Sequence, residues 1–119
     1  MPAESRLVKK IIRYVRDRGG WCEKVHGGPY QRVGLPDVLI CFRGIFVMAE
    51  TKAGTKATPA QLQVIKEINA AGGIAFVCTS VEQVQRILDN IDAWMNLVVM
   101  PVSPLPGPIL SALGANREL

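Results

Sequence analysis

Two carboxylates and one lysine lie within a short apolar stretch of this chain. In GLPDVLICFRGIFVMAETKAG, residues 34–54, Asp37 precedes one apolar run, Glu50 ends the next, and Lys52 follows two residues later. Carboxylate oxygens are hard ligands that suit Mg²⁺ or Mn²⁺. A neighbouring ammonium group adds a positive charge that can contact a phosphate. These residue types fit metal-assisted chemistry on a phosphate group, provided that the fold brings them together.

A hairpin would bring the two acids together. The dipeptide Arg43-Gly44 separates the two apolar runs, and its glycine favours a two-residue turn. With that turn, the pairing register places Asp37 directly opposite Glu50. Opposed carboxylates repel, so a shared proton, a basic partner or a bound cation must compensate. Strand alternation puts Lys52 on the same face as Glu50. The alternative is an ordinary ion pair at a sheet end, and a longer turn would shift the register and separate the acids.

Glu4 is a third acid that could face the same chemistry. It precedes Val8 and Ile11 by four and seven residues, which places it on the core-facing line of the first predicted helix. A carboxylate on that line can face the sheet. On the sequence alone, the simpler interpretation is that Glu4 complements the positive N-terminus of its helix.

The elements that must position these residues follow from hydrophobic periodicity and turn signals. The predicted elements are a helix over 4–18, a strand over 21–25, hairpin strands over 37–42 and 45–50, a helix over 59–71, a strand over 74–79 and a helix that begins after Ser80. This order, α-β-β-β-α-β-α, predicts an α/β fold with a mixed sheet flanked by helices. The continuously apolar run IAFVCT, residues 74–79, is typical of a strand in the middle of a sheet.

The last two predicted helices carry further local signals. Thr58 and Pro59 are typical of a helix start, and Gln61 is placed to complete a capping box. We expect one apolar stripe of each helix to face inward. The stripes are Leu62, Ile65 and Ile68 or Asn69 in the first helix, and Val84, Ile87, Leu88, Ile91 and Trp94 in the second.

Composition and charge narrow the class of protein. The 119 residues suffice for one domain, and no apolar run approaches the roughly 20 residues of a membrane span. The N-terminus lacks the apolar centre of a signal peptide, so we expect a cytoplasmic protein without membrane contact. Eleven of the fourteen Lys and Arg residues, but only five of the ten Asp and Glu residues, lie in residues 1–56. This basic half favours a polyanionic partner such as nucleic acid.

The cysteines and the histidine disfavour a second kind of site. Cys22, Cys41 and Cys78 are widely spaced in apolar, strand-like contexts, without a Cys-x-x-Cys pair. We therefore predict buried, reduced thiols. His26 has no second histidine with which to share a metal, which disfavours a zinc site.

The last residues of the chain change in character. Four prolines lie between Pro101 and Pro108, in a stretch with little charge. Such proline density rules out an ordinary helix or an inner strand there. We therefore divide the chain into a domain over 1–95 and a Pro-rich tail over 96–119. The apolar residues of that tail favour an arm that docks on a partner subunit, and a loose tail is the alternative.

The pattern of candidate site residues resembles a known family. The residues that carry the resemblance are Gly34, Pro36, Asp37, Glu50, Lys52 and Gln61. Their spacing is similar to the PD-(D/E)xK signature of restriction-endonuclease-like nucleases, and especially to the virus-type replication-repair nuclease (VRR-NUC) domain in its stand-alone phage or bacterial form. The resemblance covers about residues 4–91 and implies the restriction-endonuclease-like fold. It also implies that Gln61 assists at the site, and we expect that it does not serve the capping box at the same time.

The resemblance implies a role for each remaining site residue. Asp37 and Glu50 would bind Mg²⁺ or Mn²⁺ together with the backbone carbonyl of Thr51. Lys52 would orient the attacking water and steady the charge on the phosphate. Glu4 matches the acidic residue of the family's first helix, which implies an outer ligand or a residue that holds a metal-bound water.

The implied activity is metal-assisted hydrolysis of phosphodiester bonds in DNA. The stand-alone relatives imply a homodimer that acts on branched DNA, such as the Holliday junction, in a bacterial or phage-infected cell. Alternatives are a flap or nicking nuclease without junction preference, and a catalytically weak nucleic-acid-binding module of a phage replication or packaging complex. The candidate phosphate contacts are Lys9, Lys10, Arg13, Arg16, Arg32 and Lys56. Tyr30 and Trp21 could stack on bases, but we expect them to pack in the loop or the core.

Overall fold

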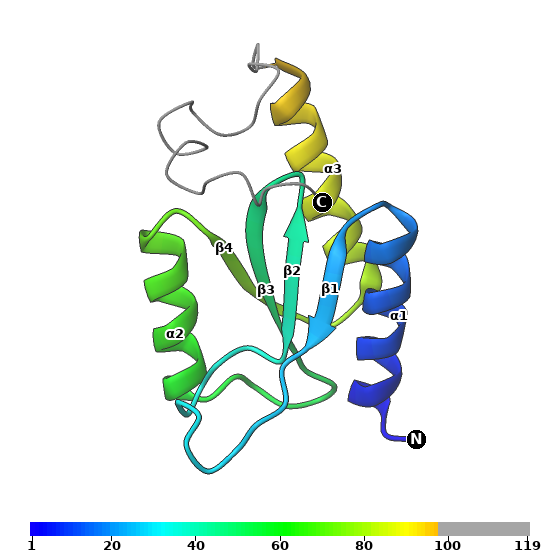
Figure 1. Ribbon diagram of the computed structural model, residues 1–119. Coiled ribbons are helices and arrows are strands. Elements are labelled where there is room, and N and C mark those ends of the chain that lie inside the picture. The colour runs from blue at the N-terminus through cyan, green and yellow to red at the C-terminus, as the bar shows by residue number, and fades with distance from the viewer. Residues whose placement is uncertain (98–119) are drawn as a thin grey trace, which may run out of the picture.

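A computed structural model describes residues 1–97, which form a four-stranded mixed sheet with three helices (Figure 1). The elements are α1 (Ala3–Asp17), β1 (Trp21–Lys24), β2 (Val38–Phe42), β3 (Ile45–Thr51), α2 (Pro59–Ala70), β4 (Ile74–Cys78) and α3 (Val81–Leu97). The predicted order and the α/β class are confirmed. The predicted tail lies outside the described residues from residue 98 onward. None of the described helices is long and apolar enough to cross a membrane.

The β2–β3 hairpin has the predicted turn and register. Arg43 and Gly44 have φ angles of 51° and 81°, so both central residues are left-handed, as in a type I′ turn. The strands are antiparallel and pair Phe42 with Ile45. Because a two-residue turn leaves no freedom in the pairing, the whole hairpin register follows from it.

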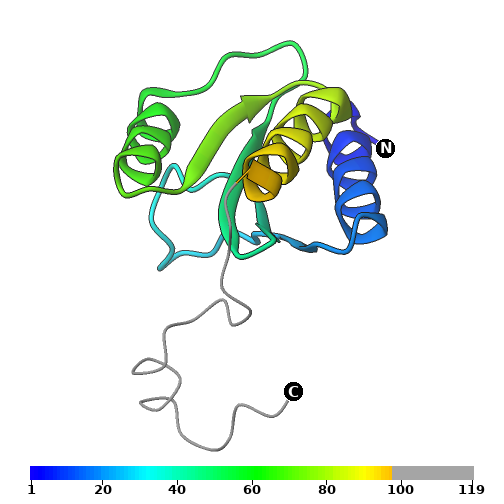
Figure 2. The same ribbon diagram turned by 90° about the horizontal axis from the view of Figure 1, so that it is seen from above.

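The core lies between one face of the sheet and the pair α1 and α3. Figure 2 shows these two helices side by side on the same side of the sheet. The buried residues of the two helices are Val8, Ile11, Val15, Val84, Leu88 and Ile91. They pack against Val38, Ile40 and Val47 of the hairpin, which alternation directs to this face. The core-facing line predicted for the first helix, through Val8 and Ile11, is therefore confirmed.

The position predicted for β4 is wrong. The strand order is β1-β2-β3-β4, so β4 lies at an edge and pairs, in parallel, with β3 alone among the described strands. Its run of apolar residues arises because α2 and α3 both pack against it. Asn69 of α2 also bonds the backbone of Ala75, accepting from its N–H at 2.8 Å and donating to its carbonyl at 3.0 Å. The side chain of Asn69 thus forms the backbone hydrogen bonds that a neighbouring strand would otherwise form with Ala75.

The inward faces of the later helices differ in part from the prediction. In α2, Leu62 is 51% exposed and Val64 is buried instead, while Ile68 rather than Asn69 is the partly buried residue. Because α2 covers only the β4 side of the sheet, its buried stripe is narrow. In α3 the predicted stripe is confirmed except for Trp94, which is 54% exposed. Trp94 instead lines an open cavity with Ile45 at the start of β3 and Ile74 at the start of β4.

The second face of the sheet carries an exposed apolar row. Trp21, Cys41 and Phe46 are directly paired neighbours on β1, β2 and β3, and all three are exposed. The prediction that all three cysteines are buried is therefore wrong for Cys41, because alternation directs it to the second face, away from α1 and α3. Cys22 and Cys78 are buried, and burial raises the pKa of the Cys22 thiol to about 11.

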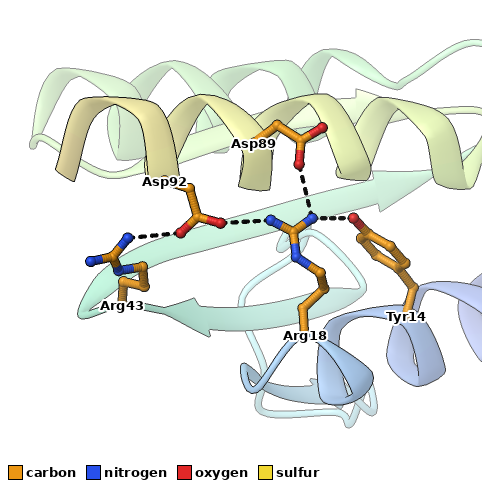
Figure 3. Close-up of polar contacts among 5 residues, drawn as sticks. All are labelled: Tyr14, Arg18, Arg43, Asp89 and Asp92. Atoms are coloured by element: carbon orange, nitrogen blue, oxygen red, sulfur yellow. Dashed lines mark hydrogen bonds and ion pairs between the residues drawn. The ribbon is translucent and has the colours of Figure 1, made fainter. Parts of the chain in front are cut away.

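An ion-pair network links the end of α1 to α3 and to the hairpin turn (Figure 3). Arg18 donates to Asp89 at 3.0 Å, to Asp92 at 2.7 Å and to the hydroxyl of Tyr14. Arg43 of the turn donates to the other oxygen of Asp92 at 2.9 Å. One carboxylate thus joins two arginines from different elements, which fixes the end of the hairpin against the helices.

Candidate active site

Three elements meet at the end of the molecule opposite this network. Asp37 immediately precedes β2, Glu50 and Thr51 end β3, and Gln61 is the third residue of α2. Figure 1 shows the start of β2, the end of β3 and the start of α2 at the same end of the fold. The hairpin accounts for the first two, since the start of β2 must lie beside the end of β3.

Glu50 is a buried acid, and only one of its two carboxylate oxygens is hydrogen-bonded within the described residues. The residue is 4% exposed, and its Oε1 accepts a hydrogen bond from Gln61 Nε2 at 2.7 Å. Its Oε2 is buried and has no hydrogen-bond partner within residues 1–97. Burial raises the pKa of Glu50, and the charge of Asp37 raises it further, while Lys52 opposes the shift. A buried acceptor without a partner is costly, so a cation at this oxygen would remove the penalty.

Asp37 is held beside Glu50 by a residue of β3. Its Oδ1 accepts from the backbone N–H of Thr51 at 2.9 Å, and its Oδ2 accepts from the Thr51 hydroxyl. The last regular pair of the hairpin joins Val38 to Ala49, and one further step of the same register places Asp37 opposite Glu50. The two acids are close enough for the charge of one to affect the pKa of the other.

Lys52 is the cation of this cluster. Its ammonium group lies 3.6 Å from Glu50 Oε1, and its side chain is only 13% exposed. The ordinary ion pair that the sequence left open is therefore present. It lies within the same group of residues as the two acids, so the ion pair and a role toward a substrate are compatible.

Gln61 serves two partners at once, which corrects our expectation. Its Oε1 accepts from the backbone N–H of Thr58 at 2.9 Å, and the Thr58 hydroxyl accepts from the backbone N–H of Gln61. This is a complete capping box. The amide nitrogen at the other end of the side chain remains available and donates to Glu50. An amide carries a donor and an acceptor on one carbon, so the two roles do not compete.

Glu4 reaches the segment that follows Lys52. Its Oε1 accepts from the backbone N–H of Ala53 at 3.2 Å, which brings the first turn of α1 to the same end of the molecule. Within residues 1–97, no group of three or more His, Cys, Asp and Glu side chains is arranged to hold a metal. Glu4 therefore does not join Asp37 and Glu50 in one set of direct ligands, and its predicted role as an outer ligand stays a prediction.

A cavity of about 350 Å³ opens onto the site. Asp37, Glu50 and Gln61 line it on one side, and the β1–β2 loop lines the other. Gly34 of that loop has a φ of 96°, and a Cβ there would lie 2.6 Å from the carbonyl oxygen of Ala60. Only glycine allows the loop to approach the first turn of α2 this closely. The glycine of the sequence pattern thus shapes the cavity wall next to Gln61.

The residues around the cavity fit a divalent cation. The available donors are carboxylate oxygens, which Mg²⁺ and Mn²⁺ prefer, and one of them is buried without a partner. Asp37 and Glu50 would hold the ion, and a backbone carbonyl and water would complete its coordination. The role predicted for the carbonyl of Thr51 stays a prediction.

The predicted phosphate contacts fall into two groups. Lys9, Lys10 and Arg13 are exposed along the outer face of α1, and Lys56 is exposed in the β3–α2 loop. The two others are engaged within the protein. Arg16 forms an ion pair with Glu23 at 2.8 Å, and Arg32 forms a two-pronged pair with Glu67 at 2.7 and 2.9 Å. The hydrogen bond from Arg32 lowers the pKa of Glu67 to about 2. Arg32 thus ties the β1–β2 loop to α2.

The two aromatic residues do not pack as we expected. Tyr30 is fully exposed in the β1–β2 loop, and Trp21 is about half exposed on β1. The loop residues on both sides of Tyr30 line the cavity. A fully exposed ring beside the site is free to contact a ligand, whereas packing in the loop or the core is excluded.

Two solved structures resemble this fold. A structure described as "VRR_NUC domain" has a TM-score of 0.63 and 27% sequence identity, and the match covers 75% of this chain and 97% of that one. A second, described as "VRR_NUC domain protein", has a TM-score of 0.53 and covers 82% of this chain and 91% of that one. At 18% identity, the second supports the fold alone. No family model matches the sequence, and no curated protein matches it.

Proposed function

We propose that the chain is a VRR-NUC-type nuclease that cleaves DNA with a divalent metal ion. A nuclease of the restriction-endonuclease-like type is the activity that this family implies. The observation that carries the proposal is the convergence of Asp37, Glu50 and Lys52, together with the buried Oε2 of Glu50, which has no partner among the described residues. A non-catalytic module gains nothing from two adjacent acids, one of them buried.

Each residue of the site has a different role in the proposed reaction. A cation bound by Asp37 and Glu50 supplies Lewis acidity toward the phosphate and toward water. Gln61 holds one oxygen of Glu50 and leaves the other for a ligand. Lys52 places a largely buried positive charge beside the acids, where it orients the attacking water or stabilises charge on the phosphate.

The outer face of α1 is proposed as the path of the DNA backbone. Glu4 fixes the start of this helix beside the site, and Lys9, Lys10 and Arg13 follow on its exposed face. The helix has 15 residues and spans about 22 Å at 1.5 Å per residue. Cations along such a length position a backbone without reading its bases.

We also propose that the substrate is branched DNA, such as a four-way junction, and that the active form is a homodimer. Two symmetric sites can cut two strands, which is what resolution of a junction requires. Within the described residues, the exposed cations of α1 suit recognition of DNA shape rather than sequence. The Pro-rich tail over 96–119 remains our proposed dimer arm, tested by light scattering of the chain with and without residues 97–119. An unchanged mass would contradict that role.

A flap or nicking nuclease is the second candidate. The observation that favours it is the full exposure of Tyr30 beside the cavity, because an exposed ring suits an unpaired base. A flap offers unpaired nucleotides, whereas the arms of a four-way junction are base-paired. The preferred DNA structure therefore distinguishes the two candidates.

A cleavage assay tests the proposal. Labelled linear, nicked, flap and four-way-junction DNA are incubated with the protein, with and without Mg²⁺ or Mn²⁺. We expect metal-dependent cleavage that falls about 10²- to 10³-fold in Lys52→Ala. Lys66→Ala changes an exposed lysine of α2 outside the cavity and serves as the matched control. Symmetric cuts confined to the junction support the homodimeric form, whereas cleavage of no substrate, or undiminished cleavage by Lys52→Ala, contradicts the nuclease.

A further inference from the structure

The carboxylate of Asp37 accepts two hydrogen bonds from one residue, Thr51. The backbone N–H of Thr51 donates to Oδ1 at 2.9 Å, and the Thr51 hydroxyl donates to Oδ2. Continuing the hairpin register places Thr51 opposite Pro36. Because proline has no N–H, the ladder cannot continue there as a regular pair. The side chain of Asp37 accepts the hydrogen bond from the N–H of Thr51 instead.

The hydroxyl bond is not an incidental surface contact. Thr51 is 1% exposed, so water does not compete for its hydroxyl. A β-branched side chain is also restricted in χ1, which limits the directions that the hydroxyl can take. With one donor on each oxygen, the carboxylate of Asp37 cannot rotate freely about its last torsion. The plane of that carboxylate is therefore fixed by Thr51.

Enough of Asp37 remains free to bind a cation. An ionised carboxylate has about four lone-pair sites on its two oxygens, and Thr51 occupies two of them. The remaining sites are held in a fixed direction next to Glu50, whose Oε2 has no partner in the part of the chain that the structure describes. A fixed carboxylate loses little conformational freedom when an ion binds, which favours binding.

We propose that Thr51 is the positioning residue of Asp37, and that its side-chain hydroxyl is required for full metal affinity. The inference rests on the proposed function, because it takes Asp37 as a metal ligand. It assigns a role to the side chain of Thr51 that is separate from any role of its backbone carbonyl. Removing a hydrogen bond that orients a metal ligand typically weakens metal affinity 10- to 100-fold.

The test measures Mn²⁺ binding to the DNA-free protein from the electron paramagnetic resonance signal of free Mn²⁺. Thr51→Val keeps the shape of the side chain and removes the hydroxyl, so we expect 10- to 100-fold weaker binding. Thr51→Ser keeps the hydroxyl and should bind like the wild type. Thr55→Val changes an exposed threonine in the β3–α2 loop and is the matched control. Circular dichroism and thermal unfolding confirm that each variant folds, and Thr51→Ala replaces Thr51→Val if the latter does not.

A cleavage assay adds a readout that a general loss of structure would not produce. In the hydroxyl-free variant, the Mn²⁺ concentration for half-maximal rate should rise while the KM for DNA stays unchanged. Wild-type Mn²⁺ affinity in a folded Thr51→Val protein, or equal loss in Thr51→Ser, would overturn the inference and leave the nuclease intact. A wild-type protein that binds no Mn²⁺ would overturn the metal-dependent nuclease itself, and the inference with it.

Discussion

At the scale of single residues, Gln61 connects the stability of a helix to the chemistry of the site. Its amide oxygen completes the capping box of α2, and its amide nitrogen fixes Glu50. The capping box holds the amide of Gln61 within hydrogen-bond distance of Glu50, because it anchors the side chain to the backbone of Thr58. The buried acid therefore depends on how the neighbouring helix begins.

Two variants separate these roles of Gln61. Thr58→Ala removes the hydroxyl of the cap and leaves the contact with Glu50, so we expect a loss of about 0.5–2 kcal/mol in unfolding free energy with the cleavage rate retained. Gln61→Ala removes the cap contact and the hydrogen bond to the charged Glu50, which is worth roughly 1.5–3 kcal/mol. We expect a larger loss of stability than in Thr58→Ala, together with a rate at least about tenfold lower. Urea unfolding and single-turnover cleavage measure the two quantities, and equal rates in both variants would contradict the role at the site.

At the scale of elements, the β1–β2 loop owes its position to one glycine. The φ of 96° at Gly34 and the 2.6 Å approach to Ala60 exclude a side chain. We expect Gly34→Ala to lower the unfolding free energy by about 1–3 kcal/mol and to slow cleavage, because the loop must move away from α2. Gly28→Ala, in the same loop, meets no atom within 4 Å and should be nearly neutral. Urea unfolding of the two variants checks the prediction, and equal losses would show that the close approach is unimportant.

The same loop presents Tyr30 to the solvent. Stacking of a base on an aromatic ring is worth about 1–3 kcal/mol, so Tyr30→Ala should weaken binding of DNA with unpaired bases by roughly 5- to 150-fold. Tyr30→Phe keeps the ring and should bind normally. Trp94→Ala removes an exposed ring from α3, which does not line the cavity, and is the matched control. Fluorescence anisotropy without catalytic metal measures affinity alone, and an equal loss on fully paired duplex would argue against stacking.

The sequence was sufficient where structure depends on neighbouring residues. A two-residue turn determines the hairpin register, so the juxtaposition of Asp37 and Glu50 could be derived from spacing. The edge position of β4 could not be derived, because the sequence does not show beside which strand the chain places β4 after α2. A run of apolar residues looks the same at the centre of a sheet as at an edge covered by helices.

The missed contacts of the site share a similar cause. The hydroxyl of Thr51 meets Asp37 across 14 residues of chain, and Arg32 meets Glu67 across 35. No pattern within a short stretch of the sequence predicts contacts between residues so far apart. The double role of Gln61 could have been inferred, since both of its signals were visible in the sequence and an amide has two functional ends.

At the scale of the whole molecule, the two ends of the sheet differ in how their charges are paired. At the hairpin turn, Arg18, Arg43 and Asp92 satisfy one another, as Figure 3 shows. At the opposite end, Glu50 keeps a buried oxygen without a partner. The ion pairs of Asp92 hold the helices to the hairpin. The cluster of Asp37, Glu50 and Lys52 can still bind a ligand. This division predicts that charge changes at the turn affect stability and leave chemistry unaltered.

The pH dependence of stability tests that division. Hydrogen bonds from Arg43 and Arg18 lower the pKa of Asp92 below its usual value of 3.8, although partial burial opposes them. Below pH 3.8 the unfolded chain therefore binds the proton more readily than the folded one, so stability from Asp92 is fully present above that pH and is lost as the pH falls through the lowered folded value. We expect Asp92→Asn to have a lower Tm than the wild type at pH 7, with the difference shrinking toward pH 2. Its cleavage rate at pH 7 should equal that of the wild type. Glu82→Gln, an exposed change in α3, should leave Tm unchanged, and a Tm difference that is constant from pH 7 to pH 2 would show that the ion pairs with Asp92 do not stabilise the fold.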